Sequence, residues 1–170
     1  MGGSMRAVVG RCEMANEVIE FALLAWREDG IWRTSRLSQE AVNDIGLVLD
    51  ALRAQQVDGG AIAMLAVDDD FFIIVRQIGA RLQMMLSDVM TALDYEIAAE
   101  VLELLDIDSP ADDDADEPAG DLSLLEDLGI DAMELQTICD DGEMYPDEKL
   151  EAIARRIGFG DQFTEVLDSE

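Results

Sequence analysis

Alternating apolar and polar positions near the start of the chain predict a β-hairpin. Between residues 18 and 27 one face of the pattern is apolar: Ile19, Phe21, Leu23 and Ala25. Such alternation is typical of a half-buried strand. Asp29-Gly30 follows, and the segment IWRTSRL then resumes the strand pattern. Because Asp and Gly both tolerate positive φ, this dipeptide between two strand patterns predicts a tight hairpin turn.

The pattern then changes from alternation to helical spacing. Ser38 precedes an apolar stripe made of Val42, Ile45, Leu49 and Leu52. This spacing predicts one helix capped by Ser38, with Leu37 and Val42 as a hydrophobic staple. Gly59-Gly60 predicts its end.

Three further strand patterns follow, separated by short turns. Residues 61–67, AIAMLAV, are apolar throughout, which is typical of a strand buried on both faces. The Asp68–Asp70 triplet leads into FFIIVRQI, and Gly79-Ala80 leads into RLQMMLS. Because these turns are short, the strands must pair antiparallel. Ser87 or Asp88 then caps a predicted second helix with apolar residues every four positions: Val89, Leu93, Ile97, Val101 and Leu105.

The order strand, strand, helix, three strands, helix predicts an α+β fold with a five-stranded, mainly antiparallel sheet and helices packed against it. This ββαβββα order is similar to that of longin, roadblock and profilin-like folds. Likeness at the level of the fold does not define an activity.

Composition divides the chain into four segments. We expect residues 1–14 to be a disordered or tag-derived N-terminus, since MGGSM resembles a tag remnant and Met14 suits a natural start. Residues 15–105 form the sheet domain. Residues 106–121 are rich in Asp and Glu with no basic residue, which predicts a solvated, extended linker.

Residues 122–170 predict a small helical domain whose first element carries Leu122, Leu125 and Leu128. Later helices carry Met133, Leu135 and Ile138, then Leu150, Ile153 and Ile157 behind Pro146, and finally Phe163, Val166 and Leu167. Whether this domain docks on the sheet stays open.

The charge of the chain is extreme. It contains 39 Asp and Glu against 11 Lys and Arg, a formal net charge of −28. Nucleic-acid affinity normally comes from Lys and Arg that displace counterions, so we expect no direct nucleic-acid binding. No apolar run approaches the roughly 20 residues of a membrane helix, and we expect a cytoplasmic protein without membrane contact.

The chain contains few of the residue types that commonly carry catalysis. It has no histidine, which removes the commonest general base and zinc ligand. Its two cysteines, Cys12 and Cys139, stand alone and are expected to be free thiols. We therefore predict no catalytic, cofactor-binding or metal-binding residues, and no enzyme.

Residues 127–135, DLGIDAMEL, resemble the phosphopantetheine attachment segment of acyl carrier proteins. Ala132 stands where the modified serine would be, so attachment is impossible. Helix capping explains the same pattern: Gly129 ends one helix, Asp131 caps the next, and Glu134 reaches back to complete a capping box.

Three other patterns have ordinary structural explanations. Asp112, Asp114 and Asp116 lack the glycine and glutamate of an EF-hand, Asp68–Asp70 is a solvated turn, and GFGDQF at 158–163 lacks the third glycine of a phosphate loop. Trp26 and Trp32 flank the hairpin turn. We interpret them as cross-strand packing, with an exposed partner anchor as the alternative.

Several segments together resemble the bacterial family of tRNA adenosine deaminase-associated proteins. They are FALLAWREDGIWRTSRL, DDDFFIIVRQIGARLQMMLSD, the acidic linker, GDLSLLEDLGIDAMELQTICDD and PDEKLEAIARRIGFG. The resemblance covers roughly residues 14–168. The family takes its name from genes beside a tRNA-editing deaminase and brings no functional residues to carry over. The deaminase chemistry itself needs an H-x-E and P-C-x-x-C zinc site, which this chain lacks.

The leading hypothesis is a non-catalytic acidic interaction protein that binds a basic surface on a partner. That partner is a tRNA adenosine deaminase or a similar nucleic-acid-processing enzyme, because a tRNA-binding enzyme must offer a basic surface. The first alternative is a stand-alone homodimeric scaffold. The second is an enzyme that uses a pair of carboxylates, which would lie buried in an apolar cleft.

Overall fold

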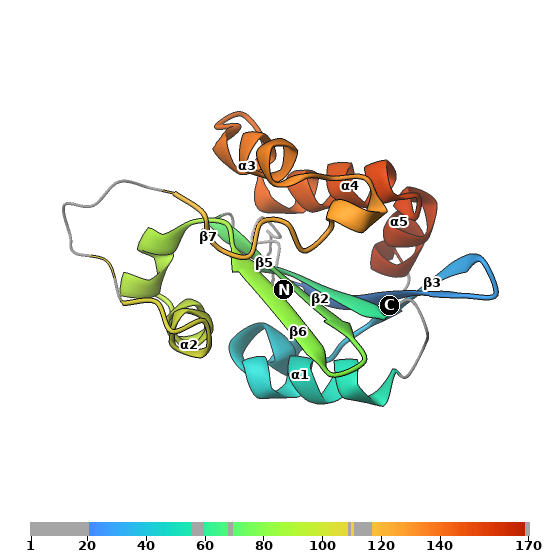
Figure 1. The fold of residues 1–170 in the computed structure, drawn as a ribbon, viewed down its shortest axis with the longest axis horizontal. Coiled ribbons are helices and arrows are strands. Elements are labelled where there is room, and N and C mark those ends of the chain that lie inside the picture. The colour runs from blue at the N-terminus through green and yellow to red at the C-terminus, as the bar shows by residue number, and fades with distance from the viewer. Residues whose placement is uncertain (1–20, 56–59, 68–69, 109, 111–116, 169–170) are drawn as a thin grey trace, which may run out of the picture.

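The computed structural model describes residues 21–55, 60–67, 70–108, 110 and 117–168. One sheet lies between two layers of helices, with α3, α4 and α5 above it and α1 and α2 below it in Figure 1. The strands are β2 (Phe21–Glu28), β3 (Ile31–Arg36), β4 (Ala61–Val67), β5 (Phe71–Ile78), β6 (Arg81–Leu86) and β7 (Ala119–Gly120). The helices are α1 (Ile45–Ala54), α2 (Glu96–Leu104), α3 (Ala132–Asp140), α4 (Pro146–Ile157) and α5 (Gly160–Asp168). Short 3-10 helices are η2 (Gln39–Asn43), η3 (Val89–Leu93) and η4 (Glu126–Leu128).

The sheet is antiparallel at every described pairing, and its strand order is β3-β2-β4-β5-β6-β7. The α+β prediction is confirmed, but the predicted number of five strands is wrong, because the sheet has six. The additional strand is β7, which pairs with the end of β6 through Met85↔Gly120 and Leu86↔Ala119. It comes from the last part of residues 106–121, the segment predicted as a linker. Residues 111–116 of that segment, and the predicted N-terminal segment 1–14, lie outside the described residues.

The predicted hairpin is confirmed. Asp29 and Gly30 have φ values of 54° and 80°, and Glu28 pairs with Ile31 across the two-residue turn. Positive φ at both central residues is the geometry of a type I′ turn, which matches the twist of the strands on either side.

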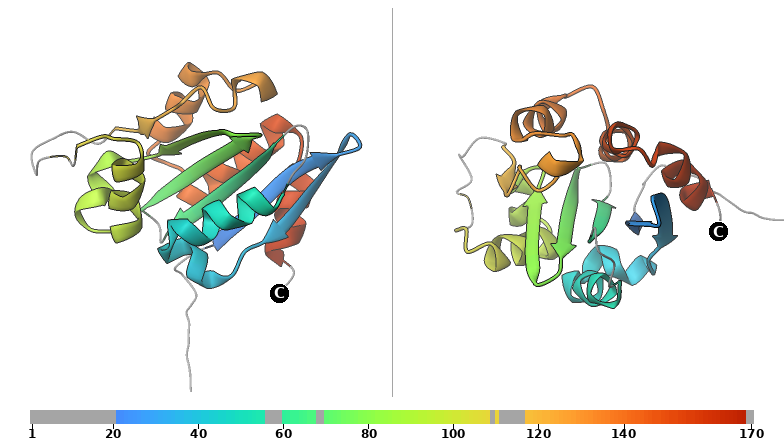
Figure 2. Two further views of the ribbon diagram at one scale, coloured as in Figure 1. Left: turned by 60° about the horizontal axis from the view of Figure 1, so that its bottom comes forward. Right: turned by 45° about the vertical axis from the view of Figure 1, so that its right-hand side comes forward.

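Strand β4 is buried along its whole length, as predicted. Ala63 and Leu65 belong to the core shared with α1 and α2, whereas Ile62 and Met64 belong to the core on the other face. Because successive side chains of a strand point to opposite faces, a strand that is apolar throughout needs a layer on both sides. The helices that cover the two faces lie on opposite sides of the sheet in both views of Figure 2.

The two helices predicted after β3 and β6 each consist of a 3-10 helix followed by an α-helix. Ser38 makes no side-chain cap; instead Asp44 caps α1 by accepting a hydrogen bond from the Gly46 amide at 2.9 Å. Asp88 caps η3 by accepting from the Met90 amide at 3.0 Å, as predicted. Leu93, predicted on the apolar stripe, is 43% exposed. The helix is interrupted between η3 and α2, so the helical spacing does not continue through Leu93.

The C-terminal helices cover the second face of the sheet. Leu135, Leu150 and Ile153 are fully buried against Ile62, Met64 and their neighbours from the strands. The C-terminal helices therefore dock on the sheet, a point that the sequence left open. Met133, predicted on the same apolar face, is 79% exposed instead, because residues two positions apart in an α-helix point to opposite sides and Leu135 is the buried one. The division into a sheet domain at 15–105 and a helical domain at 122–170 stays a prediction.

Gly120 offers a test of β7. Its φ is +100°, and a Cβ atom there would lie 2.5 Å from the Met84 carbonyl oxygen and 2.9 Å from the Met85 Cα. We expect Gly120→Ala to lower the free energy of unfolding by about 1–3 kcal/mol, because backbone must move to relieve the contact. Urea unfolding followed by circular dichroism measures the change.

Gly142→Ala is the matched control, since a Cβ at Gly142 meets no atom within 4 Å. The two variants unfolding at the same urea concentration would contradict the close approach of β7 to β6.

Candidate functional site

Hollows lie at the two opposite ends of the strands. One, the arginine pocket, lies beside the β2–β3 turn and the start of β4. The other, the acidic end, lies where β4 turns into β5 and where β6 ends. In an antiparallel sheet these two sets of strand ends are separated by the length of a strand.

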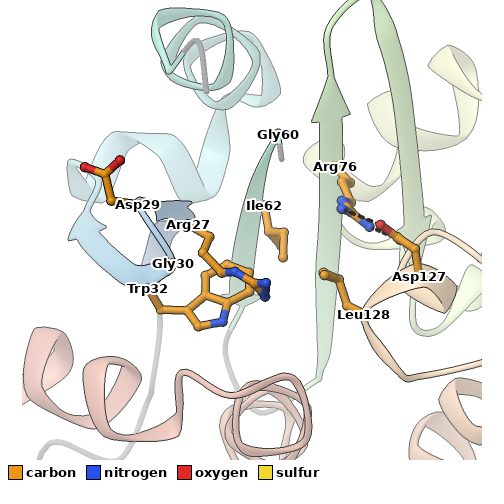
Figure 3. Close-up of a pocket in the computed structure, with 9 residues that line it drawn as sticks. All are labelled: Arg27, Asp29, Gly30, Trp32, Gly60, Ile62, Arg76, Asp127 and Leu128. Atoms are coloured by element: carbon orange, nitrogen blue, oxygen red, sulfur yellow. Dashed lines mark hydrogen bonds and ion pairs between the residues drawn. The ribbon is translucent and has the colours of Figure 1, made fainter. Parts of the chain in front are cut away.

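The arginine pocket has a volume of about 480 Å³, which falls within the range of small-molecule sites. Figure 3 shows that its residues come from the hairpin, the central strands and η4, with the Asp29 carboxylate pointing away from the others. They are Arg27, Asp29, Gly30, Trp32, Gly60, Ile62, Arg76, Asp127 and Leu128. Two guanidinium groups thus line one hollow in a chain with few cations.

Arg27 is stacked on an aromatic ring. Its guanidinium carbon lies 5.7 Å from the Trp32 ring centroid, because the two residues are opposite each other in the β2–β3 register. Trp32 is itself held by Phe159, with ring centroids 4.9 Å apart. The guanidinium of Arg27 points into the space beside Ile62 in Figure 3. The stack fixes Arg27 without using its N–H donors.

Arg76 joins the sheet to the C-terminal region. Its side chain is 3% exposed and forms a forked ion pair with Asp127, in which Nη2 lies 3.0 Å from Oδ2. Nη1 also donates to the Leu124 carbonyl at 3.0 Å. The hydrogen bond from Arg76 holds the pKa of Asp127 below its ordinary value. A buried arginine needs such a partner, since an unpaired charge is costly to bury.

The acidic end consists of two adjoining hollows of about 290 and 250 Å³ that share Asp70 and Asp88. Its carboxylates come from the β4–β5 turn, both ends of η3, the segment before β7 and the end of α3: Asp70, Asp88, Asp94, Glu117 and Asp140. Tyr95 donates a hydrogen bond to Asp70, and the Lys149 ammonium donates to the Cys139 carbonyl at 2.8 Å. Burial raises the pKa of the Cys139 thiol to about 12, so this cysteine stays protonated and unreactive.

The capping explanation of DLGIDAMEL is confirmed at Asp131, whose side chain accepts from the Glu134 amide at 2.8 Å. The predicted return bond from Glu134 is wrong. Its carboxylate accepts from Arg156 Nε at 3.0 Å instead, because α4 packs beside α3 and brings a cation within reach.

Other residues singled out by the sequence are placed as follows. Asp112, Asp114, Asp116, Cys12, Asp68 and Asp69 lie outside the described residues. Within the described ranges, no three or more acidic or cysteine side chains form a group that would hold a metal ion. Gly158 and Gly160 join α4 to α5, which is a helix–helix connection.

The two tryptophans lie on opposite faces of the sheet. Trp26 packs against the core of α1 and α2, and Trp32 packs against the core of the C-terminal helices. Cross-strand packing is confirmed for Trp32, whose partner across the hairpin is Arg27. The second contact of Trp32, with Phe159, comes from the other layer.

Sequence reasoning missed the arginine pocket. Arg76 and Asp127 are 51 residues apart, and spacing alone does not join them. One signal was present: Arg76 ends the apolar run FFIIV in a strand that is otherwise buried. A charged residue in such a position needs a partner from another segment, which points to one of the later acidic residues.

The comparisons identify the family. Residues 20–160 match the family described as Rv3753c-like tRNA adenosine deaminase-associated protein. Protein Rv3753c of Mycobacterium tuberculosis (strain ATCC 25618 / H37Rv) is 40% identical over 169 residues, which are 98% of this chain and 97% of that protein. No solved structure matches the chain significantly. The chain belongs to the Rv3753c-like tRNA adenosine deaminase-associated family, as the sequence resemblance indicated.

Two further observations describe the surface. Among the described residues, the buried polar or charged side chains are Arg76, Ser87 and Thr91, and no Asp or Glu is buried. No helix in the described part of the chain combines the length and the apolar character needed to cross a bilayer.

The Arg76–Asp127 pair gives a stability prediction. Asp127→Asn should lower the free energy of unfolding by about 1–3 kcal/mol at pH 7, because it leaves a buried guanidinium without its counter-charge. Arg76→Met should cost less, since Asp127 is 62% exposed and remains hydrated. Urea unfolding of the two variants measures the difference.

The pH dependence follows from the lowered pKa of Asp127. A carboxyl with a lower pKa in the folded state contributes stability above its unfolded pKa of about 3.9, and this contribution is lost as pH falls through the folded value. Asp127→Asn should therefore lose less stability than the parent protein on acidification. Parallel pH profiles for the two proteins would contradict the pairing.

Proposed function

We propose that this protein is a non-catalytic, acidic partner that binds and modulates a tRNA adenosine deaminase or a similar nucleic-acid-processing enzyme in the cytoplasm. The observation that carries the proposal is membership of a family described as deaminase-associated. The net charge of −28 supports it, because an enzyme that binds tRNA offers a basic surface to which an acidic protein is steered. The same charge disfavours direct binding of nucleic acid.

The acidic end is the surface that we assign to the partner. Its carboxylates surround two adjoining hollows, so a lysine or arginine side chain entering either one meets several acceptors. Neighbouring carboxylates repel one another, and binding of a cationic partner reduces that repulsion. Competition with tRNA for the basic surface of the enzyme would follow from this arrangement.

Co-purification tests the partnership directly. The protein and the tRNA adenosine deaminase of the same organism should elute together in size-exclusion chromatography at about 0.15 M salt, and the complex should weaken at higher salt because ions screen the attraction. Light scattering gives the composition of the peak. Separate elution of the two proteins would remove the proposal, and a tight homodimer without a captured partner would favour the scaffold alternative.

A charge-reversal pair locates the surface. Glu117→Lys combined with Asp140→Lys should weaken binding of the deaminase by at least about tenfold, because both side chains border the acidic end. Asp140 is the last residue of α3, where a cation suits the helix dipole, so stability should be kept. Isothermal titration calorimetry measures the affinity.

The control combines Asp50→Lys on α1 with Glu126→Lys on η4, which changes the net charge by the same amount away from the acidic end. This control should bind nearly as well as the parent protein. Equal losses for both double variants would show that net charge, and not the acidic end, determines binding.

A further inference from the structure

We propose that the arginine pocket binds a small monocarboxylic acid with an apolar body, independently of the proposed deaminase partnership. In this arrangement the carboxylate pairs with Arg27, and the apolar body lies against Ile62 and Leu128. The pocket volume of about 480 Å³ is sufficient for a ligand of this kind.

Arg27 is the group that would bind the charge. No described residue accepts a hydrogen bond from its guanidinium, although acidic residues surround it in sequence. Glu28, its neighbour, pairs with Arg33 at 3.1 Å instead. A guanidinium presents its donors as a planar fork that matches a carboxylate. The cation–π contact with Trp32 favours this position of the guanidinium before a ligand arrives, which lowers the entropy lost on binding.

The remaining lining limits the ligand to one negative charge. The guanidinium of Arg76 is already engaged by Asp127 and by the Leu124 carbonyl. Asp29 and Asp127 also line the pocket, so a second negative group would approach a carboxylate without a further cation to offset it. Ile62 and Leu128 line the same pocket and offer apolar side chains. These features favour a monocarboxylate over a phosphate or a dicarboxylate.

The test is a titration of the full-length protein with three matched probes, followed by amide and indole NMR signals. Phenylacetate carries one charge, phenylacetamide is its neutral analogue, and phenyl phosphate carries a second charge. Phenylacetate should bind with a dissociation constant on the order of 1 mM, as expected for one ion pair and a small apolar contact. Its largest shifts should fall on Gly30, Gly60 and the Trp32 indole.

Arg27→Gln should weaken phenylacetate binding by at least about tenfold, because it removes the charge-assisted hydrogen bonds. Arg53→Gln on α1, where the arginine pairs with Asp50 at 3.1 Å, is the control and should bind like the parent protein. Leu128→Trp keeps Arg27 but fills the hollow, and it should abolish binding. This second variant and the comparison of probes on the parent protein keep the test decisive if Arg27→Gln unfolds.

The proposal would be overturned by equal binding of phenylacetate and phenylacetamide, or by equal effects of Arg27→Gln and Arg53→Gln. It would equally be overturned if phenylacetate caused no saturable shift up to about 20 mM, a concentration well above the expected dissociation constant.

Discussion

Burial of both faces of the central strands is the constraint on which the rest of the structure depends. β4 is buried at every position, and β5 is buried from Phe71 to Arg76. Apolar side chains that point to opposite sides of a sheet cannot be covered by a single layer. α1 and α2 cover one face, and the C-terminal helices must cover the other. The family match, which runs from residue 20 to 160, includes α1 and α2 of the first layer and α3 and α4 of the second.

This constraint places a charged residue inside the molecule. Arg76 lies at the end of a buried strand under the C-terminal layer, where its guanidinium needs a partner. Asp127 supplies that partner from η4, and Leu124 supplies a carbonyl from the turn before it. Replacing only the partner of a buried charge costs more stability than replacing both residues of the pair with apolar ones. The remaining charge then lies in an apolar environment without a counter-charge. The pair therefore joins the C-terminal segment to the sheet at β5.

Most helices, strands and turns could be predicted from the sequence, but the contacts between distant segments could not. Local rules predicted the Asp29-Gly30 turn and the Asp131 cap, because each depends on neighbouring residues alone. β7 was missed because two paired residues leave no alternation to detect, and the acidic composition around them favours solvent. The arginine pocket was missed for a different reason: Arg27 and Trp32 are local, but Asp127 arrives from a distant segment. A contact between residues far apart in the sequence can be identified only once the fold is known.

The distribution of the few cations links the fold to the proposed functions. Several described cations are used in short-range pairs, such as Arg156 with Glu134 and Arg155 with Glu151, which join or brace the C-terminal helices. Such pairs cancel charge only locally, so most carboxylates remain to create a long-range negative field. Under the two proposals, that field steers a basic macromolecule from a distance and disfavours multiply charged anions in the arginine pocket. In the proposal for the arginine pocket, a carboxylate with one charge meets less repulsion than a multiply charged anion and gains the local attraction of Arg27, so the two proposals are compatible in one acidic protein.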